Sequence, residues 1–199
     1  MRTYRGNGGL RVARSKQVSD DEIVGTTLRL VAEHGPSLTL AQVGESVGLS
    51  AATVMQRFGS KRALMLKAAH AWGKSDGSEF QRGGHVGDDL VEGMAEIAAL
   101  METPQQVANI NASMHIDLAD PEFHAIIEAE IQRQRGFVRE TLDNGIEVGD
   151  IKPCDTAELS RHLQVVALGA VQSWTIEPTG ALTEWVHRCL KETIEPWRA

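Results

Sequence analysis

The chain has 199 residues, of which 42% are hydrophobic and 24% charged, and its formal net charge at pH 7 is −7. This length can hold a small domain and a larger second one, with enough apolar residues to fill both cores. No apolar run approaches the length of a membrane-spanning helix, and no apolar segment follows the N-terminal arginines, so neither membrane insertion nor a secretory signal is expected. The two cysteines, Cys154 and Cys189, are too few for a disulfide framework, which favours reduced thiols and a cytoplasmic location.

The charge is divided unevenly along the chain. Residues 1–74 carry eleven Lys and Arg against five Asp and Glu, whereas the remaining residues carry nine against twenty-two. The N-terminal part therefore has a net charge of +6 and the rest −13. Because each phosphate is neutralised locally, such a split favours a DNA-binding N-terminal part. A surface bias without function is the alternative explanation.

Residues 1–18 are expected to form a flexible basic arm, because they combine glycines and cationic residues without helical periodicity before Val12. Such an arm can lie along phosphates or enter a minor groove. It can equally be a terminus that only adds charge. The sequence leaves these two possibilities open.

The first helix is predicted to begin after Ser19 and to end at Gly35 and Pro36. The Ser19 hydroxyl can cap the helix, and three acidic residues follow it, at 20–22, where they favour the positive end of the helix.

Residues 39–61 have the pattern of a helix-turn-helix. Apolar residues recur at helical spacing from Leu40 to Val47, and Gly48 can then adopt the left-handed conformation that ends a helix. Ser50 can cap a second short helix. A helical hairpin with a glycine at its turn is the alternative, because such hairpins are common.

The second helix of this pair is predicted over residues 51–57. Two alanines, Ala51 and Ala52, stand at its start, where short side chains would let the N-terminus approach base edges. Lys61 falls in the first turn of the next helix, predicted over residues 60–73, at a position suited to a phosphate contact. The sequence therefore predicts a recognition helix for the DNA major groove.

From Ser19 to Trp72 the chain resembles the DNA-binding domain of the TetR family of bacterial transcriptional regulators. The matching positions are Ile23, Leu30, Gly35, Thr39, Val43, Gly48, Ser50, Thr53, Phe58, Ser60, Lys61 and Leu64. Four positions depart from the family pattern. Met55 stands where the family usually has a tyrosine that touches a DNA phosphate, and Gly44 replaces a common alanine. Gln56 and Arg57 occupy the places often held by His or Tyr and by an aromatic residue.

The resemblance implies a three-helix DNA-binding domain over residues 19–73 and a helical effector-binding and dimerisation domain over residues 74–199. We expect an all-α fold with about nine helices. The candidate DNA-binding residues are Thr39, Ser50, Ala51, Ala52, Thr53, Met55, Gln56, Arg57 and Lys61.

Beyond a polar connection at residues 73–87, helical periodicity continues to the end of the chain. Helices are predicted over residues 88–101, 104–118, 121–144, 155–175 and 181–195. Asn144 and Gly145 are typical of a helix end, and Asp155 can cap the helix that follows.

The last two predicted helices carry small and large apolar residues together, a composition that suits close helix packing. An intramolecular core and a dimer interface both fit this pattern, and the resemblance favours a dimer. The candidate interface residues are Leu159, Leu163, Val166, Ala167, Ala170, Trp185, Val186 and Cys189.

Methionines and aromatic residues in the middle helices can line a pocket for a small hydrophobic effector, although an ordinary helical core is the alternative for each of them. The candidates are Met94, Met101, Met114, His115, Phe123, Ile127, Phe137 and Trp174. His115 and His124 are separated by a spacing that matches no standard metal motif, so no metal and no other cofactor is expected.

The sequence contains no catalytic motif that we could identify, and no enzymatic activity is expected. The predicted function is that of a homodimeric transcriptional repressor that a small molecule releases from a palindromic operator. The alternative is a helical ligand-binding or protein-interaction module whose helix-turn-helix no longer binds DNA.

Overall fold

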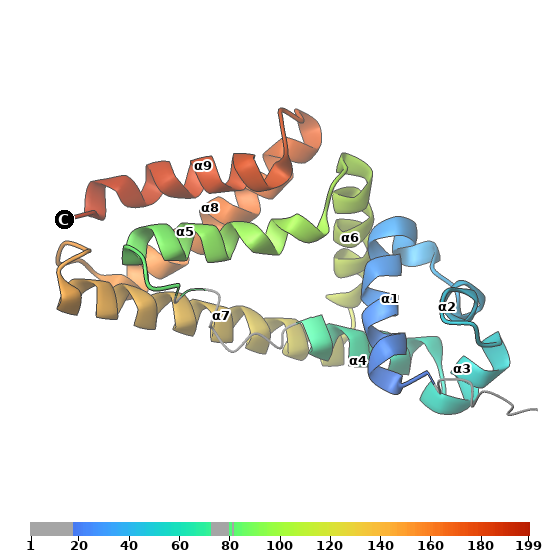
Figure 1. Ribbon diagram of the computed structural model, residues 1–199. Coiled ribbons are helices and arrows are strands. Elements are labelled where there is room, and N and C mark those ends of the chain that lie inside the picture. Colours follow the sequence, from blue (N-terminus) through green and yellow to red (C-terminus); the bar gives the residue numbers. More distant parts are fainter. Residues whose placement is uncertain (1–17, 73–79, 81) are drawn as a thin grey trace, which may run out of the picture.

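The computed structural model describes residues 18–72, 80 and 82–199. Within these residues the chain forms nine α-helices and no strand, which confirms the predicted all-α fold (Figure 1). The helices are α1 (Asp20–His34), α2 (Leu40–Ser46), α3 (Ala51–Phe58), α4 (Lys61–Trp72), α5 (Val86–Glu96), α6 (Pro104–Asp117), α7 (Pro121–Val148), α8 (Thr156–Ile176) and α9 (Leu182–Ile194). None of these helices is both long and apolar enough to cross a membrane.

We call α1–α4 the head and the described residues from 80 onward the body. The head has its own apolar core, in which Ile23, Val43 and Val54 are almost completely buried. A second core lies within the body and includes Phe80, Leu142 and Leu163. All of the predicted arm over residues 1–18 except Val18 lies outside the described residues, as do residues 73–79 and 81 of the predicted connection over residues 73–87.

The helix starts follow from capping side chains. Ser19, Ser50 and Asp155 each accept a hydrogen bond from the backbone three residues on, as predicted. Thr39 forms a complete capping box with Gln42 at the start of α2. These bonds satisfy backbone N–H groups that have no partner inside the helix.

The prediction that the long helix ends at Asn144 and Gly145 was wrong. α7 continues to Val148 and ends at Gly149, which has a left-handed backbone with φ of 84°. Gly145 lies inside the helix, where a Cβ atom would stand 2.6 Å from the Ile151 side chain. The glycine therefore allows close packing and does not end the helix.

The first body helix also differs from its prediction at both ends. α5 begins at Val86, two residues before the predicted start, because the carbonyl of His85 accepts hydrogen bonds from the Asp88 and Asp89 N–H groups. It ends at Glu96 and is followed by a 3-10 turn over Ile97–Leu100.

The head and the body meet along two pairs of helices, α1 with α6 and α4 with α7 (Figure 1). Asn109 of α6 donates from Nδ2 to the carbonyls of Ala32 and Glu33, at 3.0 and 2.9 Å. Arg62 of α4 donates to Asp120, which caps α7. The body thereby holds the C-terminal end of α1 and the first turn of α4.

The helices predicted to form a dimer interface, α8 and α9, pack against each other within the protomer. Leu159, Leu163, Ala170 and Val186 are buried in the body core, so they are not accessible to a partner. Val166, Ala167, Trp185 and Cys189 are half-buried against the same core. The exposed large apolar residues of α8 are Val165, Leu168 and Ile176, which were not among the candidates.

Candidate DNA-binding site

The turn between α2 and α3 depends on two glycines. The Gly44 carbonyl accepts hydrogen bonds from the N–H groups of Val47 and Leu49, at 3.1 and 2.7 Å. A Cβ atom at position 44 would lie 2.6 Å from the Leu49 carbonyl oxygen. Gly48, as predicted from its place in the sequence, has a positive φ of 71°. The turn is therefore tighter than an alanine at position 44 would allow.

This turn sets which face of α3 is exposed. Val54 and Phe58 are buried in the head core and anchor the helix. Ala52, Met55 and Gln56 are exposed on the opposite side, with 45% of the Met55 surface accessible. An exposed, short helix with a small residue in its first turn is the form that enters a major groove.

Several candidate DNA-binding side chains also hold the head together. Ser50 Oγ accepts from the Thr53 N–H and lies 2.9 Å from Thr53 Oγ1. Thr39 Oγ1 accepts from the Gln42 N–H as part of the capping box. Both hydroxyls lie at exposed helix starts, so the same groups that cap the helices are accessible to phosphate oxygens.

The two candidate cations are tied to neighbouring segments. Arg57 donates to the Val18 carbonyl at 2.8 Å and lies 3.5 Å from Asp20. Lys61 Nζ donates to the Pro36 carbonyl at 3.0 Å. A DNA phosphate would have to replace these contacts or share the cation with them.

The positive charge of the N-terminal part does not lie on the described head. Residues 18–72 carry five Lys and Arg and five Asp and Glu, so this segment is neutral. Residues 1–17 carry five Lys and Arg and no acidic residue. The other three cations of the head are also engaged: Arg29 with Glu33, Arg62 with Asp120, and Lys67 over the Phe58 ring.

The structure brings only some of the candidate effector residues together. Met101, Met114 and Ile127 line one cavity of about 410 Å³ between the head and the body. Phe123 lines an adjoining pocket of about 290 Å³.

The remaining candidates lie elsewhere. Met94 and Trp174 are buried in the body core, and the Trp174 Nε1 donates to the Gly180 carbonyl. Phe137 packs against the same core, beneath the Arg133 guanidinium. His115 is exposed. No group of three or more potential metal ligands occurs among the described residues.

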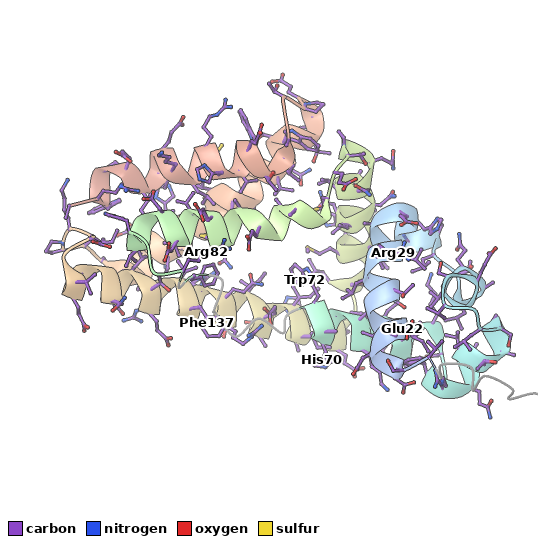
Figure 2. All side chains as sticks on the ribbon, viewed as in Figure 1. Glu22, Arg29, His70, Trp72, Arg82 and Phe137 are labelled. Atoms are coloured by element: carbon purple, nitrogen blue, oxygen red, sulfur yellow. The ribbon has the colours of Figure 1, made fainter. Side chains whose placement is uncertain are left out.

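Sequence reasoning missed the contribution of the head to this cavity. α1 supplies Leu28, Arg29 and Val31, and α4 supplies Met65 and Trp72. Figure 2 shows Arg29 on α1 and Trp72 at the end of α4, both near the junction of head and body. The structure shows why these residues are available: the head core buries Leu28 and Met65 only in part, and the sequence pattern does not record this.

A short exposed helix presented by a helix-turn-helix, next to a larger helical body, defines a DNA-binding regulator. Residues 23–68 match the family model of the bacterial regulatory proteins of the tetR family. The DNA-binding domain of this chain is therefore of the TetR family, which confirms the predicted resemblance. No curated protein matches the sequence.

Over about nine tenths of its length the chain shares its fold with solved structures, several of which are described as TetR-family transcriptional regulators. NemR of E. coli in its reduced form has a TM-score of 0.72 at 14% identity, covering 90% of this chain and 97% of its own. A transcriptional regulator from Saccharomonospora viridis in complex with choline has a TM-score of 0.68 at 16% identity, with 90% and 97% covered. SmeT, the repressor of the Stenotrophomonas maltophilia efflux pump SmeDEF, has a TM-score of 0.64 at 17% identity, with 92% of each chain covered.

Proposed function

We propose that this DNA-binding regulator is a homodimeric repressor that binds a palindromic operator through α3 and leaves it when a small molecule binds. The observation that carries the proposal is the TetR-type head, in which α3 exposes its N-terminal turn and the side chains of Met55 and Gln56. The S. maltophilia relative SmeT is a repressor, and the S. viridis relative was solved with choline, which support repression and ligand binding respectively.

An exposed apolar stripe on α8 supports the dimer. Val165, Leu168 and Ile176 are 60%, 58% and 76% exposed, and their spacing places them on one face of the helix. Contact with the same stripe of a second copy would remove this apolar surface from water. A two-fold dimer would present two α3 helices to successive major grooves, which is the reason to expect a palindromic operator.

The effector would act by favouring one arrangement of the two heads. Its effect can be no larger than its preference for that arrangement over the one that binds DNA. The contacts of Asn109 with α1 and of Arg62 with Asp120 make the head follow the body, so a change in the body can move α3.

The test is selection of DNA from a random-sequence pool by the purified full-length protein at moderate salt. We expect recovery of a palindromic site. The variant Ala52→Glu places a carboxylate in the exposed first turn of α3, where the helix tolerates it but the phosphates repel it. It should lose specific binding while remaining folded.

The matched control is Ala157→Glu, which makes the same change at the second position of α8, where the alanine is also exposed. This control should bind the selected site as the wild type does. Failure of a folded, dimeric wild type to retain any site would instead favour a helical module whose helix-turn-helix does not bind DNA.

The dimer has its own test. Leu168→Glu puts a charge in the middle of the exposed α8 stripe and should convert the protein to a monomer in analytical ultracentrifugation. Val148→Glu, at an equally exposed valine of α7, should leave the oligomeric state unchanged. A Leu168→Glu protein that sedimented as the wild type does would rule out this face as the interface.

A further inference from the structure

The cavity between the head and the body is mostly apolar. Helices α1, α4, α6 and α7 line a cavity of about 410 Å³. Its apolar lining includes Leu28, Met65, Trp72, Ile110, Met114 and Ile127. This size is within the range of pockets that bind small organic molecules.

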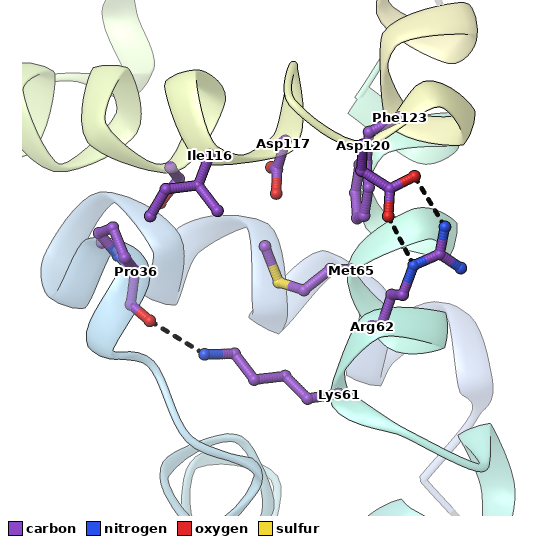
Figure 3. A pocket seen from close by; sticks show the side chains of 10 residues that line it. Pro36, Lys61, Arg62, Met65, Ile116, Asp117, Asp120 and Phe123 are labelled. Atoms are coloured by element: carbon purple, nitrogen blue, oxygen red, sulfur yellow. Dashed lines mark hydrogen bonds and ion pairs between the residues drawn. The ribbon is translucent and has the colours of Figure 1, made fainter.

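One carboxylate in this apolar lining has no partner among the described residues. Asp117, the last residue of α6, lines both the cavity and the adjoining pocket. Its side chain makes no hydrogen bond or ion pair with any described residue, and Figure 3 shows it pointing toward Met65 (Figure 3). Burial raises the pKa of Asp117, and the nearby Asp120 carboxylate raises it further.

The nearest cations do not neutralise Asp117. Arg29, at the cavity wall, is paired with Glu33 at 2.9 Å. Lys61 lowers the pKa of Asp117, but its ammonium donates to the Pro36 carbonyl instead (Figure 3). Arg62 is held by Asp120 and Glu122. Among the described residues that line the cavity, Asp117 is therefore a charged residue without an ion-pair partner.

A second polar group on the shared wall is also unsatisfied. Ser113, one turn before Asp117 on α6, lines both pockets, and its buried hydroxyl oxygen has no hydrogen-bond partner within the described part of the chain. A buried hydroxyl without a partner costs free energy that a bound molecule can recover.

We propose that this cavity binds an apolar molecule that carries one amine or ammonium group, with the cation against the Asp117 carboxylate and the apolar part among Trp72, Met114 and Ile127. An anionic ligand would meet the unpaired carboxylate, and an uncharged one would bury it further without compensation. A cation gains the ion pair and can also lie near the Trp72 ring. The inference rests on the proposed function, since it assigns a chemical class to the effector.

The position of the cavity gives the ligand direct contact with the DNA-binding part. α1 and α4 of the head and α6 and α7 of the body all contribute to the walls. An occupant therefore touches both sides of the junction, and it can change how the head is held without a relay through the body core.

The test is isothermal titration calorimetry of the full-length protein, without DNA, against three probes of equal chain length. Decyltrimethylammonium should bind about tenfold or more tightly than decanol, because it alone gains the charge interaction. Decanoate should bind most weakly. The Asp117→Asn variant, which keeps the shape of the side chain, should lose the preference for the cation over decanol.

Glu147→Gln removes one negative charge from an exposed site of α7, twenty residues and therefore about 30 Å from Ile127, and should keep the preference. Equal binding of decanol and the cation to the wild type, or an unchanged preference in Asp117→Asn, would overturn the proposal. Because no DNA is present, this result is independent of whether the protein selects an operator. If the protein selected an operator but bound decanol and decyltrimethylammonium equally, the proposed class of ligand would be refuted and the proposed DNA-binding function would stand.

Discussion

Gly44 shows how a single residue controls the geometry of the recognition helix. From sequence it was only a departure from the alanine common in the family. In the structure its backbone approaches the Leu49 carbonyl so closely that a Cβ atom has no room. Because α3 begins immediately after this turn, the contact determines where α3 starts.

Gly44→Ala should reduce the free energy of unfolding by about 1–3 kcal/mol, because the turn must open to admit the methyl group. Urea denaturation followed by circular dichroism measures the change. Gly136→Ala is the control: it also replaces a helical glycine, but with open space around it, and should stabilise α7 by up to about 1 kcal/mol. If Gly44→Ala unfolded at the same urea concentration as the wild type, the close approach would not constrain the turn.

A second prediction at this scale concerns the charged pair between α4 and α7. Arg62 donates two hydrogen bonds to Asp120, at 2.7 and 2.8 Å, and lowers the pKa of Asp120 to about 2. A carboxylate whose pKa is lowered in the folded state contributes stability above its unfolded pKa of about 4, and this contribution is lost as the pH falls toward 2.

Arg62→Gln should therefore lower the Tm slightly at pH 7, with a deficit that shrinks as the pH falls from about 4 toward 2. Thermal unfolding from pH 7 to about pH 2 measures this deficit. The effect is small because both side chains are partly exposed, at 49% and 30%. A deficit that did not change with pH would show that Arg62 stabilises by packing, for example over the Phe123 ring, and not by charge.

At the scale of helices, the junction depends on how α6 meets the end of α1. The final carbonyls of a helix have no partner within it. The side-chain amide of Asn109 donates a hydrogen bond to the Ala32 carbonyl and another to the Glu33 carbonyl. The positive φ of Gly35 lets the chain turn away from α1 next to Asn109. A Cβ atom on Gly35 would lie 3.2 Å from Asn109, which leaves little space.

Asn109→Ala should cost about 1–2 kcal/mol of unfolding free energy, because two carbonyls lose their donor and the hydrogen bond to one of them, that of Ala32, is partly buried. Chemical denaturation gives the value. Asn144→Ala provides the comparison, since Asn144 is exposed on α7 and its replacement should be nearly neutral. Equal effects of the two substitutions would contradict a specific role of Asn109 at the junction.

At the scale of the whole molecule, the distribution of charge bears on DNA binding. The described head has no net charge, and the N-terminal excess of positive charge lies almost entirely in residues 1–17. If α3 binds in a groove, much of the phosphate neutralisation must come from this segment or from cations now engaged within the head. The arm remains a prediction, and it can be tested directly.

Deletion of residues 1–15 removes four arginines and should weaken operator binding. The slope of log affinity against log salt should decrease by roughly 0.9 for each arginine that contacts a phosphate. Fluorescence anisotropy at several salt concentrations measures both quantities. Unchanged affinity and an unchanged salt slope would show that residues 1–15 add charge without contacting DNA. Selection of the same operator sequence by the deletion protein would show that the bases are read by α3 and not by this segment.

The sequence by itself determined the helical class, the order of the helices and the TetR-type head. These depend on local information: apolar spacing, capping hydroxyls such as Ser19 and Ser50, and glycines that end helices. The sequence predicted a wrong helix boundary where a glycine allows close packing and does not end the helix. Gly145 is typical of a helix end, but Ile151 packs against it from outside the helix, and no local pattern records that contact.

Only the tertiary structure decided which residues share a surface. Leu163 and Val186 lie in the protomer core, and the exposed stripe of α8 consists of Val165, Leu168 and Ile176. The cavity likewise combines Leu28 and Trp72 of the head with Met114 of the body. The physical reason is that helical periodicity shows only how apolar one face of a helix is. The packing of helices that are distant in sequence decides whether other helices of the chain cover that face or leave it exposed to a partner or a ligand.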